Sequence, residues 1–142
     1  MKTDKKNIIS WIAVLLCMAV IFILSAQTAD ESQSLSDRFI IIFGLELSSD
    51  FVRTCAHFLE YAGLSVLVYN ALYRSFCCTK PVLSVAVSAI YAVTDEIHQL
   101  FVEGRAFQIS DILIDSAGAV SGVTVLSIII FVYTKIKRRK QA

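Results

Sequence analysis

The stretch IISWIAVLLCMAVIFILSA, residues 8–26, contains no charged side chain, and it decides the class of fold. A helix needs about 20 mostly apolar residues to cross the hydrocarbon core of a bilayer, and this stretch has that length. The rest of the chain agrees, since 56% of its 142 residues are hydrophobic and only 18% are charged. A soluble domain of this size has too little interior to hide so many apolar side chains. The sequence therefore predicts an integral membrane protein and excludes a disordered chain.

Three further segments combine the length and apolar character of membrane spans with a few ionisable residues. They cover approximately residues 55–76, 81–102 and 109–133. No internal repeat or long linker divides the chain. We therefore predict an all-α integral membrane fold, a four-transmembrane-helix bundle that forms one domain over residues 1–142.

An amphipathic segment lies between the first two predicted spans, within residues 27–54. Its part SLSDRFIIIF, residues 34–43, carries one apolar helical face made of Leu35, Phe39, Ile42 and Phe43. Such a helix either lies in the membrane interface or packs as a lid on the bundle. The fold prediction thus includes an outer amphipathic segment between helices 1 and 2.

The distribution of basic residues predicts the orientation in the membrane, because cytoplasmic loops carry an excess of lysine and arginine. With the N-terminus inside, only Arg38, Arg53 and Arg105 among the 13 basic residues fall on the outer side. The inner side then holds Lys2, Lys5, Lys6, Arg74, Lys80, Lys135, Lys137, Arg138, Arg139 and Lys140. Both termini are therefore predicted to be cytoplasmic. The net charge is only +1, so the chain lacks the excess of basic residues that would indicate nucleic-acid binding.

Ionisable residues inside spans are costly, by about 2.5–3.5 kcal/mol or more for a central charge. Three predicted spans nevertheless carry them, and the alternating direction of the spans brings all of them except Arg74 to one depth near the outer face. Within each span the spacing is i,i+3 or i,i+4, which lets the members share one helix face. The cluster consists of His57 and Glu60, then Asp95, His98 and Gln99, and then Asp111 and Asp115.

This cluster has two interpretations. Its side chains either make interhelical hydrogen bonds that only fix the bundle, or they form a functional site, and their density favours the site. The predicted catalytic residues are His57, Glu60, Asp95, His98, Asp111 and Asp115. Arg53 and Arg105 at its rim are predicted to bind a phosphate or carboxylate of the substrate. Glu96 lies about 100° around the helix from Asp95 and is predicted to face lipid headgroups.

A divalent metal ion is an open cofactor prediction. Carboxylates with imidazoles suit zinc, manganese or iron, whereas carboxylates alone suit magnesium or calcium. The candidate ligands are Asp95, His98, Asp111 and Asp115.

Glycines predict two details of the packing. Gly118 and Gly122 form a Gly-x-x-x-Gly pattern, which lets helix backbones approach closely. We expect this contact within one chain rather than between two copies. Gly104 is expected to serve the tight turn between the last two spans.

The strings YAVTDEIHQLFVEGR (residues 91–105) and DILIDSAGAVSG (residues 111–122) resemble the VanZ-like family, as do HFLEYAGL (residues 57–64) and IFILSAQ (residues 21–27). The family's polar positions fall on Arg53, His57, Glu60, Tyr61, Asp95, Glu96, His98, Gln99, Arg105, Asp111 and Asp115. The resemblance thus adds Tyr61, Gln99 and Glu96 to the predicted substrate-binding residues. Glu103 departs from the family pattern, in which proline precedes Gly-Arg.

The resemblance implies a small multi-pass protein of the bacterial cytoplasmic membrane. It also implies an association with resistance to teicoplanin, a lipid-bearing glycopeptide antibiotic that acts on cell-wall precursors outside the membrane. No settled biochemical activity comes with the family.

Two hypotheses for function follow from the residues. The first is a membrane hydrolase or transferase that acts at the outer leaflet on a lipid-linked or lipid-like anionic substrate. The second is a non-enzymatic protein that binds or sequesters a lipoglycopeptide, a cell-wall precursor or an anionic lipid. Transport is disfavoured, because the charged groups stop in the outer half of the spans. In both hypotheses the partner is a membrane lipid or a lipid-linked small molecule.

Overall fold

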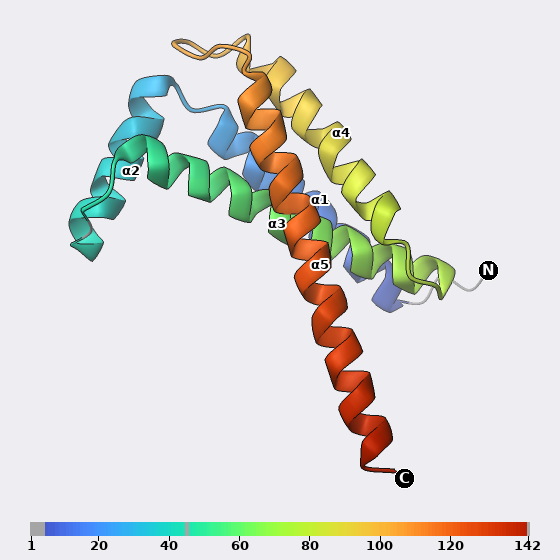
Figure 1. Cartoon of the computed structure of the whole chain (residues 1–142). Coiled ribbons are helices and arrows are strands. Elements are labelled where there is room, and N and C mark those ends of the chain that lie inside the picture. Colours follow the sequence, from blue (N-terminus) through green and yellow to red (C-terminus); the bar gives the residue numbers. More distant parts are fainter. Residues whose placement is uncertain (1–4, 45, 142) are drawn as a thin grey trace.

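The computed structural model describes residues 5–44 and 46–141, and over these residues the only regular secondary structure is helical (Figure 1). Lys2, which the charge count includes, lies outside the described residues. The predicted all-α fold is confirmed. The helices are α1 (Lys5–Ser25), α2 (Ala29–Phe43), α3 (Ser49–Phe76), α4 (Pro81–Gln99) and α5 (Ile109–Arg139).

Two of these helices, α1 and α5, are long and apolar enough to cross a membrane. They correspond to the first and last predicted spans. α3 and α4 match the other two predicted spans in position, but their length and composition do not independently mark them as spans. The physical reason is the polar content of these two helices, which includes Glu60 on α3 and Asp95 and Glu96 on α4.

α3 is the central helix of the molecule, and it packs against each of the other four. Its middle and C-terminal part provide most of the apolar core, including Tyr61, Leu64 and Val68, which are almost completely buried. Val14 and Ile21 of α1 pack into the same core. The apolar core therefore lies between α1, α3 and α4, next to the polar end of these helices.

α5 crosses α3 at the predicted glycine pattern. A Cβ atom added to Gly118 would overlap the backbone carbonyl of Phe58, and one added to Gly122 would overlap that of Ala62. The expectation that these glycines pack within the chain is confirmed. Beyond the crossing, α5 extends away from the other helices, and its C-terminal half is exposed (Figure 1).

α2 is the predicted amphipathic helix, and it begins with a capping box formed by Thr28 and Glu31. Its buried residues are the small Ser32 and Ser36 rather than its apolar face. Leu35, Phe39, Ile42 and Phe43 are all exposed. This exposure is typical of a helix that lies in a membrane interface, and it disfavours a lid packed through its apolar face.

Candidate functional site

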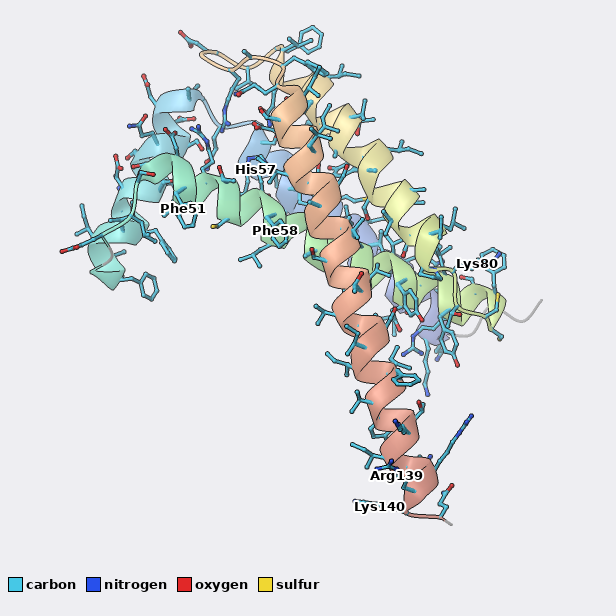
Figure 2. The ribbon with its side chains drawn as sticks, viewed as in Figure 1. Phe51, His57, Phe58, Lys80, Arg139 and Lys140 are labelled. Carbon is cyan, nitrogen blue, oxygen red and sulfur yellow. The ribbon has the colours of Figure 1, made fainter. Side chains whose placement is uncertain are left out.

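A polar cavity of about 340 Å³ opens where the N-terminal ends of α3 and α5 lie side by side. Figure 2 marks His57 on α3, on the N-terminal side of the α5 crossing near Phe58. The close approach of the helix backbones at Gly118 positions the first turns of α5 against this part of α3. The cavity is lined by Asp50, Arg53, Thr54, His57, Gln108, Ser110, Asp111 and Ile114.

The innermost contact of this cavity joins an imidazole to a carboxylate. His57 Nδ1 lies 3.5 Å from Asp115 Oδ1, and the Asp115 side chain is completely buried. This distance suits an ion pair but is too long for a strong hydrogen bond. Because Asp115 lies on the Nδ1 side, the other ring nitrogen of His57 is the one available to a ligand in the cavity. A carboxylate that orients an imidazole in this way is a recurrent arrangement for general base catalysis.

Glu60 and Asp95 extend the cluster beneath His57. The charge of Glu60 interacts with those of His57, Asp115 and Asp95, so the three helices α3, α4 and α5 contribute to one electrostatic unit. Asp95 is 2% exposed, and Tyr61 is completely buried beside these carboxylates. The structure thus brings together five of the six residues predicted to be catalytic, because Asp111 lines the cavity with His57 and interacts with His57 and Asp115. The five are His57, Glu60, Asp95, Asp111 and Asp115.

Several buried atoms of this region have no hydrogen-bond partner within the described part of the chain. They are His57 Nδ1, Tyr61 Oη, both carboxylate oxygens of Asp95 and of Asp115, Glu96 Oε1 and His98 Nδ1. Leaving one such group unpaired in a protein interior costs about 1–3 kcal/mol. Groups placed only to fix the bundle would be expected to pair with one another. Those of His57, Asp95 and Asp115 belong to the one cluster and therefore support a functional interpretation of it.

His98 and Gln99 face a different neighbour, helix α1. The His98 ring stacks on Phe22 with ring centroids 4.2 Å apart, and Gln99 Nε2 donates a hydrogen bond to Ser25 Oγ at 3.4 Å. Neither residue lines the cavity, although the charge of His98 interacts with that of Asp95. Ser25 is a polar neighbour that sequence reasoning missed, and its place beside Gln27 at the end of the first apolar run was the available signal.

Glu96 has a placement that contradicts the sequence-based expectation. It was predicted to face lipid headgroups, but it is completely buried. Its Oε2 atom accepts a hydrogen bond from the backbone N–H of Gln108 at 2.8 Å. Gln108 is the N-cap of α5, and its own side chain makes no capping bond. Glu96 therefore fixes the start of α5 to α4, a role that helical spacing alone could not reveal.

The two arginines differ in their relation to the cavity. Arg53 lines it and pairs with the exposed Asp50 at 2.9 Å, an exposed type of ion pair that contributes little stability. Arg105 does not line it and instead donates from Nε to the backbone oxygen of Gln27 at 3.3 Å. Partial burial and the positive charge of nearby Arg53 lower the pKa of the Arg105 guanidinium, which nevertheless stays protonated. Two cations are thus held near one another at the end of the cluster next to the α4–α5 turn.

The turn that carries Arg105 is fixed at several points. Gly104 adopts a left-handed conformation with φ +73°, as expected for a tight turn. The backbone oxygen of Glu103 accepts a hydrogen bond from Ala29 N at 3.3 Å, which ties the turn to the start of α2. The departure from the family pattern at Glu103 therefore leaves a well-anchored turn.

The described residues do not provide a set of ligands for the predicted metal ion. Over residues 5–44 and 46–141, no three histidine, cysteine, aspartate or glutamate side chains are grouped so that they could hold a metal ion. The prediction of a divalent cofactor stays open to elemental analysis.

These features define an all-helical protein with two candidate membrane spans and a polar cluster at one end of its helices. The sequence model of the VanZ/LLP1 family matches residues 10–131. The chain therefore belongs to the VanZ/LLP1 family, and the resemblance seen in its sequence is confirmed. No curated protein and no solved structure matches the chain significantly.

Proposed function

We propose that the protein crosses the bacterial cytoplasmic membrane four times, with both termini in the cytoplasm and the polar cavity on the outer side. The two candidate spans α1 and α5 support the membrane location. The excess of basic residues at the N-terminus, near Lys80 and at the end of α5 supports the orientation. Figure 1 is consistent with it, since the start of α1, the end of α5 and the α3–α4 turn lie away from α2 and the α4–α5 turn.

At this outer cavity the protein binds the anionic headgroup of a lipid-linked or lipid-like substrate. Arg53 supplies a cation at the cavity wall, and its present partner Asp50 is exposed and easily replaced by a ligand. Arg105 adds positive potential from the adjacent turn. A guanidinium group binds phosphate or carboxylate through paired hydrogen bonds.

The reaction is hydrolysis or group transfer at a phosphate ester or amide of this substrate. His57 accepts the proton of the attacking water or hydroxyl group and then delivers it to the leaving oxygen or nitrogen. Asp115 orients the imidazole and stabilises its protonated form. The observation that carries this proposal is the 3.5 Å contact between His57 Nδ1 and buried Asp115, beneath a cavity that Arg53 also lines.

The test uses purified protein in bilayers made from bacterial membrane lipid extract, with the recovered lipids analysed by mass spectrometry. The proposal expects a product that forms with the wild-type protein and not with His57→Gln. Lipid bound by the wild-type protein but returned unchanged would contradict catalysis. It would support the second candidate function, in which the protein sequesters its ligand without changing it. The cellular trait that matches this function is tolerance of a glycopeptide antibiotic. One observation favours this candidate: of the residues predicted to be catalytic, only His57 and Asp111 line the cavity.

A further inference from the structure

A second concave surface of the molecule lies between α2 and the N-terminal half of α3, and it is apolar. This groove has a volume of about 410 Å³, within the usual range for small-molecule sites. Both helices and the link between them contribute to it. Its principal lining residues are Leu35, Phe39, Leu47, Phe51, Cys55 and Leu59.

The groove is held open by polar contacts at its end rather than filled by apolar packing. Ser49 at the start of α3 donates a hydrogen bond to Asp37 of α2, which joins the two helices there. Phe39, Phe51 and Leu59 remain 45%, 53% and 66% exposed. Figure 2 shows Phe51 on the same half of α3 as His57. Helix α3 therefore carries both a polar cavity and an apolar groove within its first turns.

The two sites have a common neighbour at the N-terminus of α3. A third depression shares Asp50 with the polar cavity and Leu47 with the apolar groove. It includes Ser48 and Ser49, which begin the helix, and Asp37 of α2. The cavity that bears Arg53 and the groove, which has no charged side chain among its lining residues, thus both adjoin one depression at the N-terminus of α3.

We infer that this groove binds one hydrocarbon chain of a membrane lipid whose anionic headgroup occupies the Arg53 cavity. A hydrocarbon chain matches the apolar lining of the groove, and an amphiphile matches a groove of this kind next to a cavity that bears Arg53. The amphipathic α2 with its exposed apolar face provides the lipid-side wall. This inference rests on the proposed function in two respects, the location in a bilayer and the binding of an anionic headgroup. The site for the hydrocarbon chain is a separate groove and is tested separately.

The test measures immobilised lipid by electron paramagnetic resonance. The full chain is placed in phosphatidylcholine bilayers that contain phosphatidylglycerol spin-labelled near the end of one acyl chain. Ala56→Trp fills the groove, and Leu59→Trp fills it from the next turn of α3. Ala86→Trp is the matched control, because Ala86 is exposed on α4 and lines none of the described pockets. We expect each filling variant to lower the motionally restricted fraction by the share of the single lipid that the groove holds, and the control to leave that fraction unchanged.

Two results would overturn the chain site: an unchanged restricted fraction in both filling variants, or an equal loss in Ala86→Trp. Cross-linking of Cys55 to a second copy of the chain would overturn it as well, because protein would then cover the groove. Arg53→Gln separates this inference from the proposed function. If the headgroup site is correct, Arg53→Gln loses the preference for spin-labelled phosphatidylglycerol over spin-labelled phosphatidylcholine. If only the chain site is wrong, the wild-type protein still shows this preference although the filling variants have no effect.

Discussion

At the scale of single residues, the contact between His57 and Asp115 distinguishes the cluster from ordinary interhelical hydrogen bonding. Asp115 is completely buried on α5, and His57 on α3 is its nearest cationic partner at 3.5 Å. The same histidine lines the cavity, so it connects the buried carboxylates with any bound ligand. His98, the other histidine, stacks on Phe22 outside the cavity. The two histidines are therefore expected to respond differently to substitution.

We predict that His57→Gln lowers turnover of the lipid extract by about 10²-fold or more, the usual contribution of a general acid–base group. His98→Gln is the matched control and is expected to keep most of the activity, because its ring contacts α1 rather than the cavity. Both rates are measured by mass spectrometry of the lipid product. Full activity in His57→Gln, or an equal loss in both variants, would contradict the assignment.

Glu96 provides a second prediction at this scale. Glu96→Ala leaves the backbone N–H of Gln108 without its acceptor and should destabilise the fold by about 1–3 kcal/mol. Glu96→Gln retains an acceptor oxygen and should be much closer to the wild type. Glu103→Ala is the control, since Glu103 contacts Ala29 through its backbone oxygen, which alanine keeps. Thermal unfolding in detergent measures all three, and equal stability of Glu96→Ala and Glu103→Ala would refute the capping role.

At the scale of helices, the crossing of α5 over α3 determines whether the site forms. His57 and Asp115 come from these two helices, and their approach depends on the absence of side chains at Gly118 and Gly122. Small residues at a crossing allow this backbone contact in membranes, where no hydrophobic effect drives helices together.

We therefore predict that Gly118→Ala destabilises the protein by about 1–3 kcal/mol, the usual cost of overpacking a close contact. Gly63→Ala is the matched control on α3, because a Cβ there has no neighbour within 4 Å. It should be neutral or slightly stabilising, since alanine favours a helix more than glycine does. Thermal unfolding in detergent distinguishes the two, and a wild-type stability for Gly118→Ala would contradict the crossing.

At the scale of the whole molecule, the proposed topology places Cys77 and Cys78 in the cytoplasm. Both thiols are exposed at the turn between α3 and α4. In intact cells we expect a membrane-impermeant maleimide to leave them unlabelled until the membrane is permeabilised. The variant Glu103→Cys, at the opposite turn, should be labelled without permeabilisation. The reverse pattern would invert the topology.

The sequence predicted much of this arrangement from two simple rules. Apolar length located the helices, and alternating direction brought His57, Asp95 and Asp115 to the same end. Neither rule indicates which neighbouring helix a side chain meets. That is why His98 was expected in the site but faces α1, and why Glu96 was expected near headgroups but caps α5.

The apolar face of α2 was equally visible in the sequence, but its packing was not. Helical periodicity showed that Leu35 and Phe39 share one face, and it left open whether that face packs on the bundle. The small Ser32 and Ser36 make the contact instead, because small side chains let α2 approach its neighbours. The groove beside α3 results from this packing of α2, which depends on contacts between helices and not on a local sequence pattern.

The central claim is that the first turns of α3 and α5 form one cavity on the outer side of the membrane. Thr54 and Ser110 line it from the two helices. In a chain whose native cysteines are replaced by serine, the double variant Thr54→Cys/Ser110→Cys is treated with a short, membrane-impermeant bismaleimide on intact cells. We predict an intramolecular cross-link between the two positions without permeabilisation. Labelling of the two cysteines from opposite sides of the membrane, or from the cytoplasmic side only, would contradict the account.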